Sequence, residues 1–259
     1  MLSDNTNAAW EALGRNDPYY GVLTEDRYRS GKLDAMARVA FLDSGRVHMT
    51  GLLRRVEALV GPVARGKALD FGCGVGRLAL PLTKDCGFAA VTGMDISESM
   101  LVEARLNAAR ESLSNLEFAL SDDRLSRLSG GFNFVHSYIV LQHIPVVRGE
   151  ALVRALIAQV LPDGVVALQL PFFRKVGALR GLVSYLRVRV MPLHIATNIL
   201  KGRPWNEPPM QMNCYDMNSL LRIFRDSGLP QVTAEFMDDG SNICVYLIAR
   251  RPALPCQIS

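Results

Sequence analysis

The stretch KALDFGCGVGRLALPL, residues 67–82, decides the fold. Its apolar start at 67–71 predicts a strand, which runs into glycines at alternate positions, Gly72, Gly74 and Gly76. A run rich in leucine and alanine follows and predicts a helix over 77–84. Glycine allows a tight turn against a ligand, and the start of the helix offers free N–H groups to an anionic group. The stretch therefore predicts a nucleotide-like cofactor at the end of this strand.

Strands and helices alternate through the residues that follow. Residues 1–60 have helical spacing, with helices expected at 28–41 and 46–60 on either side of Ser44-Gly45. Strands are then expected at 68–71, 89–94, 117–120, 132–139 and 165–170, and helices at 77–84, 98–112 and 148–160. Such a rhythm is typical of a mostly parallel sheet covered by helices on both faces.

The rhythm breaks after Pro171. Residues 172–203 contain seven Lys or Arg and no Asp or Glu, and a helix is expected over 174–190. A helix at 216–227 and two strands at 231–237 and 242–250 follow, and the Asp-Asp-Gly-Ser sequence between the strands predicts a hairpin. The expected fold is α/β, a seven-stranded, mostly parallel, doubly wound sheet with a C-terminal antiparallel hairpin. Its expected parts are an N-terminal helical cap (1–60), a core (61–171), a basic helical insertion (172–213) and the rest of the core (214–252).

Composition sets broad limits on function. The chain has 259 residues, 49% hydrophobic and 21% charged, and a net charge of +4, which is typical of a soluble protein and gives no argument for nucleic acid. Its five cysteines have no CxxC spacing, so reduced thiols in the cytoplasm are expected. The polar N-terminus does not resemble a signal peptide, and charges interrupt the longest apolar region, so no transmembrane segment is expected.

Asp95 alone does not decide between cofactors, whereas two further features do: the SDD sequence at 121–123 and the antiparallel hairpin at the C-terminus of a parallel sheet. Asp95 closes the second expected strand and suits a ribose diol, which nicotinamide cofactors and S-adenosylmethionine both carry. Arg77 stands where a dinucleotide fingerprint has its third glycine. Asp122 or Asp123, after the third strand, would accept a hydrogen bond from an adenine amino group.

With these features the chain is similar to the class I S-adenosylmethionine-dependent methyltransferases, of the type that methylates small-molecule or sugar hydroxyls. The resemblance covers about residues 60–171 and 214–251. It rests on DFGCGVG (70–76), MDIS (94–97), SDD (121–123), FNFVHSYIVLQHIP (132–145), LPDGVVALQLP (161–171) and the C-terminal helix and hairpin. Residues 172–213 are longer than the family's usual link, which leaves the substrate open.

The resemblance implies S-adenosyl-L-methionine as cofactor and a set of residues that bind it. Asp95 would hold the ribose, Ile96 and Met100 would lie against adenine, and Asp122 or Asp123 would accept from its amino group; a turn at Asp122 and ordinary core packing at Met100 are the alternatives. The implied cofactor-binding residues are Asp70, Gly72, Cys73, Gly74, Asp95, Ile96, Met100, Asp122, Asp123 and Ser137.

Histidine supplies the candidate catalytic group. His143 follows the fourth strand at the expected cofactor edge, and an ordinary pKa of about 6.5 suits a general base or a residue that positions the acceptor. The alternative is that His143 only packs or caps its loop. His136 is expected to pack inside its strand. His48 is expected in the core or on the surface, and His194 is a candidate to face substrate. No cluster has metal-ligand spacing, so no metal is expected.

The expected activity is methyl transfer to a hydroxyl of a small molecule, sugar or polysaccharide. Oxygen is preferred because the fourth-strand motif lacks the Asn/Asp-Pro-Pro-Tyr type of signature. The alternatives are an NAD-linked or nucleotide-sugar oxidoreductase and a non-catalytic, methyltransferase-like partner-binding subunit. The basic insertion is either a solvated helix face, a lid over the acceptor, or, through 172–203, a contact with anionic lipid. The sequence does not indicate the oligomeric state.

Overall fold

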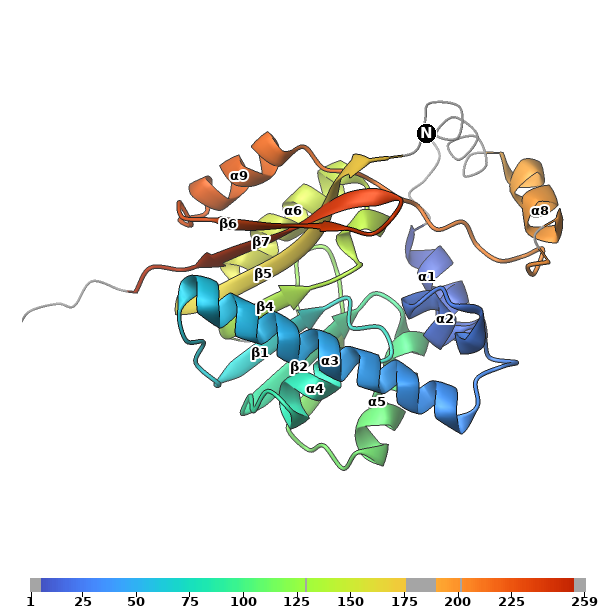
Figure 1. The fold of residues 1–259 in the computed structure, drawn as a ribbon, viewed down its shortest axis with the longest axis horizontal. Helices are drawn as coiled ribbons and strands as arrows, with labels where there is room; N and C mark the ends of the chain where they lie inside the picture. Colours follow the sequence, from blue (N-terminus) through green and yellow to red (C-terminus); the bar gives the residue numbers. More distant parts are fainter. Residues whose placement is uncertain (1–5, 129, 176–189, 201, 254–259) are drawn as a thin grey trace, which may run out of the picture.

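The computed structural model describes residues 6–128, 130–175, 190–200 and 202–253. Within these residues the chain forms a seven-stranded sheet (Figure 1). The strand order is β3-β2-β1-β4-β5-β7-β6. Of these strands, β7 runs antiparallel to the other six, which run parallel to one another. The predicted α/β class with a C-terminal antiparallel hairpin is thereby confirmed.

The strands are β1 (Lys67–Phe71), β2 (Ala90–Asp95), β3 (Leu116–Leu120), β4 (Phe132–Ser137), β5 (Val160–Arg174), β6 (Thr233–Asp238) and β7 (Asn242–Arg250). The α-helices are α1 (Thr6–Asn16), α2 (Pro18–Val22), α3 (Ala35–Val60), α4 (Ala79–Lys84), α5 (Glu98–Arg110), α6 (Val146–Ala158), α8 (Met191–Leu200) and α9 (Met217–Asp226). Two short 3-10 helices are η1 (Asp26–Tyr28) and η2 (Leu141–His143).

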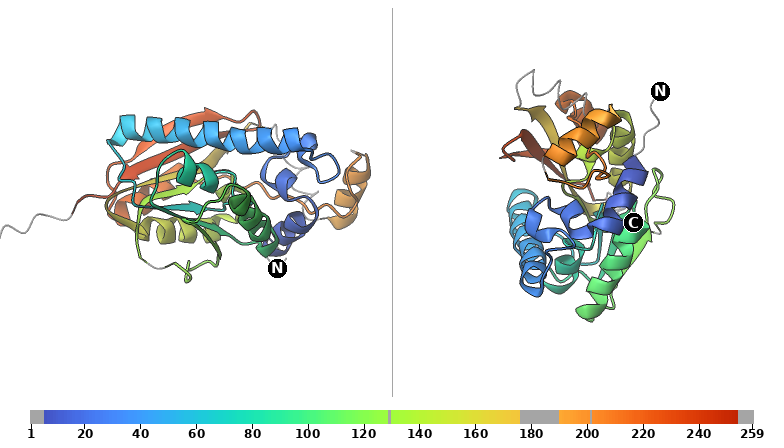
Figure 2. Two further views of the ribbon diagram at one scale, coloured as in Figure 1. Left: turned by 90° about the horizontal axis from the view of Figure 1, so that it is seen from below. Right: turned by 90° about the vertical axis from the view of Figure 1, so that its right-hand side faces the viewer.

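Helices cover both faces of the sheet. The apolar sides of α3, α4 and α5 form one core with β1, β2 and β7, while α6 and α9 form a second core on the other face. Figure 2 shows α3 and α6 on opposite sides of the strands. The strands are therefore fixed from both sides, and their carboxyl ends form a rigid edge on which a site can be built.

Helix α3 differs from the prediction because it continues through Ser44-Gly45 without a break. A Cβ at Gly45 would lie 2.1 Å from the carbonyl oxygen of Arg77. The glycine thus lets α3 pack against the end of the glycine-rich loop and does not end the helix. Spacing along one segment cannot reveal a close contact with a distant one.

Strand β5 is longer at both ends than the predicted 165–170: Val160 pairs with Phe132 of β4 at its start, and β7 pairs with it as far as Arg174 at its end. Ser97 is the N-cap of α5, and its hydroxyl accepts from the Met100 N–H. Of the helix expected at 174–190, Arg174 lies in β5, and residues 176–189 lie outside the described residues.

Each described cation of the basic insertion has a partner within the chain. Arg174 donates to the Met212 carbonyl, Lys175 pairs with Asp238, and Arg203 pairs with Glu207. The other four, Arg180, Arg187, Arg189 and Lys201, lie outside the described residues. Among the described helices, none combines the length and the apolar character that a membrane crossing requires.

Candidate functional site

A pocket of about 900 Å³, which includes space open to solvent, lies at the carboxyl ends of β1, β2 and β4. Most of the residues predicted to bind cofactor, together with the predicted catalytic residue, lie in its wall. They are Asp70, Gly72, Cys73, Gly74, Asp95, Ile96, Met100, Asp123 and His143. These residues come from four separate segments of the sequence, which meet at one sheet edge.

All three glycines of the glycine-rich loop have positive φ, and Gly76 has φ of +86°. Gly72 and Gly74 have φ of +75° and +54°, a region that other residues rarely adopt. A Cβ at Gly72 would lie 2.2 Å from the side chain of Val140. The N–H groups of Gly72 and Cys73 donate to the Met94 carbonyl at 2.7 and 2.9 Å, which ties the loop to β2.

Asp95 connects this loop to the start of α5. One carboxylate oxygen accepts from the Gly74 N–H at 2.8 Å and the other from the Ser97 N–H at 2.9 Å. Burial raises the pKa of Asp95 to about 6, although these backbone hydrogen bonds favour the charged form. The carboxylate is the hydrogen-bond acceptor that the sequence predicts at the end of β2.

Asp70, at the end of β1, has one oxygen engaged and one without a partner. His136 Nδ1–H donates to Asp70 Oδ1 at 2.9 Å, and Oδ2 has no hydrogen-bond partner. His136 Nε2 lies 3.4 Å from the Tyr246 hydroxyl, which lies 3.1 Å from His48 Nε2. His136 is fully buried, as the sequence predicts, and it also orients Asp70.

The structure separates the two aspartates after β3. Asp122 accepts from the backbone N–H groups of Arg124 and Ser126, so it shapes the turn and lies outside the pocket wall. Asp123 reaches the pocket wall and pairs with Arg148 at 2.7 Å. Asp122 therefore does not lie where a residue that binds the adenine amino group is expected. Its contacts are those of a turn residue, which was the alternative.

Ser137 likewise lies behind the pocket wall. Its hydroxyl is fully buried and donates to the Phe71 carbonyl at 3.0 Å, a bond that joins β4 to β1. The small side chain lets the hydroxyl reach the backbone of the neighbouring strand. The structure gives Ser137 a structural contact and no contact with the pocket.

His143 lies in η2 with a single defined tautomer. Its Nδ1–H donates to the Gln211 carbonyl at 2.7 Å, and the Gln142 amide nitrogen lies 3.3 Å from Nε2. Burial lowers the pKa of His143 to about 4, so the ring is neutral at pH 7. The Trp10 ring lies 4.9 Å away, between ring centroids.

The N-terminal helices contribute pocket residues that the sequence did not single out. Thr6, Asn7 and Trp10 of α1 line the pocket, whereas the side chains of Tyr19 and Tyr20 contact other parts of the protein. Tyr19 donates to Glu103 and Asn107, and Arg29 lies over the Tyr20 ring. In sequence, Trp10 has the same spacing as a core residue, and no signal marks it as a pocket residue.

The loop after β4 is strained. Ile139 has φ of +60°, a conformation that is unfavourable for a β-branched residue. Its N–H donates to the buried Gln169 side chain at 3.0 Å. This bond holds Tyr138, Ile139 and Val140 in the pocket wall beside the glycine-rich loop.

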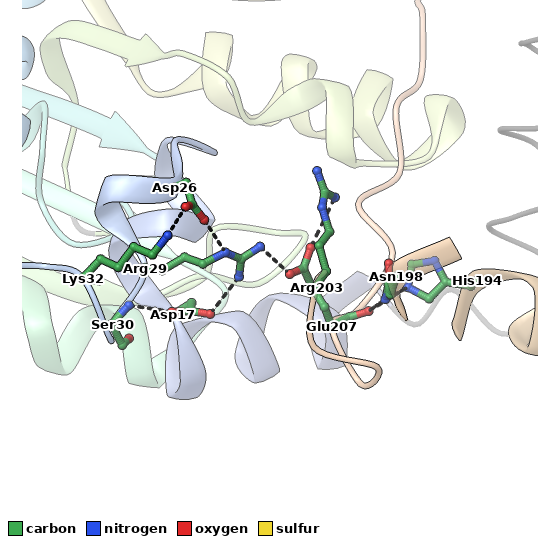
Figure 3. A network of polar contacts seen from close by, with 9 residues as sticks. All are labelled: Asp17, Asp26, Arg29, Ser30, Lys32, His194, Asn198, Arg203 and Glu207. Carbon is green, nitrogen blue, oxygen red and sulfur yellow. Dashed lines mark hydrogen bonds and ion pairs between the residues drawn. The ribbon is translucent and has the colours of Figure 1, made fainter. Parts of the chain in front are cut away.

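An ion pair joins the N-terminal segment to the residues after α8 (Figure 3). Arg29 pairs with Glu207 at 2.7 Å and with Asp17 at 3.2 Å. The Glu207 carbonyl accepts from His194 Nε2–H at 2.7 Å, so His194, the candidate to face substrate, lies outside the pocket wall. Among the described residues, no group of three or more His, Cys, Asp or Glu could hold a metal ion.

Residues 68–164 match the family model described as "Methyltransferase domain". The ubiquinone biosynthesis O-methyltransferase of Neisseria meningitidis serogroup C is 33% identical over 141 residues, which are 53% of this chain and 55% of the relative. The release factor glutamine methyltransferase of Agrobacterium fabrum is 33% identical over 86 residues, 33% of this chain and 30% of the relative. The chain thus spans about half the length, or less, of these curated relatives.

Solved structures share the fold over most of the chain. The magnesium protoporphyrin IX methyltransferase of Synechocystis, with bound S-adenosylmethionine, has a TM-score of 0.59 at 21% identity and covers 97% of this chain and 98% of its own. A Haemonchus contortus phosphoethanolamine N-methyltransferase has a TM-score of 0.59 at 16% identity and covers 78% and 52%. At these identities the likeness concerns the fold.

Proposed function

Since this chain belongs to the class I S-adenosylmethionine-dependent methyltransferases, we propose that it transfers the methyl group of S-adenosylmethionine to a hydroxyl of a small molecule. One observation carries the proposal: the glycine-rich loop, Asp95 and His143 lie in the wall of a single pocket. Each of them comes from a different motif, and the sheet edge brings them together.

The pocket fits this cofactor at two points. Gly72 and Gly74 have positive φ and no space for a Cβ, so both positions require glycine. Their exposed backbone lets a ligand approach closely. Asp95 offers a carboxylate, an acceptor-only group, where ribose hydroxyls need one. Asp123 is the better-placed candidate for the adenine amino group, because Asp122 does not reach the pocket.

When bound, S-adenosylmethionine supplies a methyl group that is already activated on a sulfonium. The task of the chain is then to align the acceptor and to keep water away. His143 is neutral, and its Nε2 is free of a hydrogen because Nδ1–H is held by Gln211. We propose that the acceptor hydroxyl takes the place of the Gln142 amide, which lies 3.3 Å from Nε2, and donates to Nε2, which orients the oxygen. A pKa of about 4 makes full deprotonation by His143 inefficient.

Apolar side chains surround the remainder of the pocket, which supports an apolar or aromatic acceptor over a polysaccharide. The apolar residues beyond the cofactor motifs are Trp10, Val22, Leu78, Val140, Ile144 and Leu152. The O-methyltransferase relatives support oxygen as the methylated atom. The sequence after β4, Ser-Tyr-Ile-Val, also lacks the Asn/Asp-Pro-Pro-Tyr type of signature.

Isotope transfer tests the proposal. The protein is incubated with methyl-labelled S-adenosylmethionine and matched panels of phenols, sugars and amines, and products are identified by mass spectrometry. We expect label in phenol ethers, and less of it with His143→Ala. Label confined to amines or sugars would refute the acceptor class, and binding of NAD in place of S-adenosylhomocysteine would refute the cofactor.

A further inference from the structure

Arg77 is a buried cation in the pocket wall whose charge has no ion pair within the described ranges. The residue is 5% exposed, and its Nε is buried without a hydrogen-bond partner. Within the described ranges its side chain makes one long hydrogen bond, from Nη1 to the Ser44 hydroxyl at 3.4 Å. A guanidinium held out of water without a counter-charge is costly, and burial lowers the pKa of Arg77 accordingly.

The position of Arg77 is fixed by the fold. It is the residue after the third glycine of the loop, and its backbone carbonyl packs directly against Gly45 of α3. Its guanidinium lies 5.9 Å from the centroid of the Tyr138 ring, on the strained loop after β4. The cation therefore has little freedom to move to solvent.

A second unsatisfied group lies in the same wall and has the opposite charge. Asp70 Oδ2 is buried without a partner, while Oδ1 is occupied by His136. Of the five such buried atoms among the described residues, these two line the pocket. Asp70 and Arg77 attract one another electrostatically, yet within the described ranges no hydrogen bond or ion pair joins them. A ligand with both an ammonium and a carboxylate would satisfy the two groups at once.

We propose that Arg77 binds the carboxylate at the amino-acid end of the cofactor, with Asp70 Oδ2 accepting from the adjacent ammonium group. The inference rests on the proposed function and adds the residue that selects a cofactor with an intact carboxylate. A charge-assisted hydrogen bond of this kind contributes about 1.5–3 kcal/mol, which corresponds to about a 10- to 150-fold change in affinity.

Calorimetric titration with two nucleosides tests the inference without any turnover. S-adenosylhomocysteine carries the amino-acid end, and 5′-methylthioadenosine lacks it. For Arg77→Met we expect affinity for S-adenosylhomocysteine to fall about 10- to 150-fold and affinity for 5′-methylthioadenosine to be unchanged. Arg55→Met, on the exposed side of α3 where Arg55 pairs with Glu235, should leave both affinities unchanged.

Several results would overturn the inference. One is an Arg77→Met variant that binds S-adenosylhomocysteine as the wild type does, and another is an equal loss for both nucleosides. A third is an Arg77→Met variant that binds both nucleosides normally but whose complex with S-adenosylhomocysteine has lost affinity for added benzoate. Arg77 would then bind an acidic acceptor instead.

If Arg77→Met does not fold, Arg77→Lys takes its place. Wild type is also titrated with decarboxylated S-adenosylhomocysteine, and equal affinity for the two forms would refute a carboxylate site. A wild type that binds neither nucleoside would refute the proposed function itself.

Discussion

His136 holds one carboxylate oxygen of Asp70 at 2.9 Å and leaves the other oxygen without a partner. Both side chains are buried, at 0% and 2% exposure. The bond joins adjacent strands, since Asp70 ends β1 and His136 faces it from β4 in register. The orientation of a group in the cofactor pocket thus depends on a residue that does not line the pocket.

Replacing His136 with phenylalanine should destabilise the protein. The ring volume is retained, but Asp70 is left buried with neither oxygen bonded, which costs about 3–5 kcal/mol of unfolding free energy. His48→Phe removes only the far end of the same hydrogen-bond chain and should cost about 1 kcal/mol. Urea unfolding measures both variants. Equal losses would mean that the Asp70–His136 bond has no special role.

Gly72→Ala should abolish binding of S-adenosylhomocysteine. The new Cβ would meet the Val140 side chain at 2.2 Å, at a φ of +75°. Gly87→Ala is a matched control, because Gly87 has φ of +73° and a Cβ there would meet nothing within 4 Å. Backbone strain should cost both variants about 1 kcal/mol of stability, and Gly72→Ala should lose more because its Cβ also displaces the Val140 side chain. Calorimetry should show lost binding for Gly72→Ala alone, and retained binding there would contradict the account.

Lowering the pH below 6.5 should destabilise the protein through two histidines. Burial, and then the nearby charges of His136 and Arg77, lower the pKa of His48 to about 3, and burial lowers that of His143 to about 4. The unfolded chain therefore takes up these protons first, so the stabilising effect is complete above about pH 6.5 and is lost as the pH falls. Each histidine costs about 1.4 kcal/mol per pH unit in that window.

His48→Phe isolates this effect. Between pH 7 and pH 5 the wild type should lose about 2 kcal/mol more unfolding free energy than the variant does, measured in urea at each pH. The comparison also removes the opposing contribution of Asp95, whose raised pKa of about 6 is present in both proteins. Parallel pH curves for the two proteins would show that His48 titrates normally.

The Arg29–Glu207 ion pair should hold residues 203–213 against the N-terminal segment, with the Gln211 carbonyl on His143 at the edge of the pocket. Glu207 is 8% exposed at its side chain and Arg29 16%, so the pair is largely shielded from water. Glu207→Gln should increase hydrogen exchange across 203–213 and lower stability by about 1 kcal/mol. Glu25→Gln is the control: it breaks the ion pair with Arg27, in which both side chains are over half exposed. It should change neither hydrogen exchange nor stability. Unchanged exchange in Glu207→Gln would rule out a role for the pair in holding this segment.

The sequence predicts most of the sheet and the cofactor motifs because both depend on local pattern. The glycine-rich loop and Asp95 each follow an apolar strand, so their place at the sheet edge follows from the strand order. Asp122 and Asp123 are adjacent and chemically identical, and only the turn geometry decides which of them reaches the pocket. Spacing carries no information about that choice.

Contacts between distant segments account for what the sequence does not reveal. Trp10 reaches His143, and Arg77 lies under α3, only because tertiary packing places them there. Gly45 was expected to interrupt a helix, yet it serves a close contact with Arg77. The Gln211 carbonyl sets the tautomer of His143 from 68 residues away.

Calorimetric titration of S-adenosylhomocysteine into the wild type and into Asp95→Asn at pH 7.5 tests the central claim most directly. We expect one site per chain in the wild type and at least a tenfold weaker affinity in Asp95→Asn, because the ribose hydroxyls lose a charged acceptor. Equal affinity in the two proteins, or no binding by the wild type, would contradict the claim that this pocket is the cofactor site of a methyltransferase.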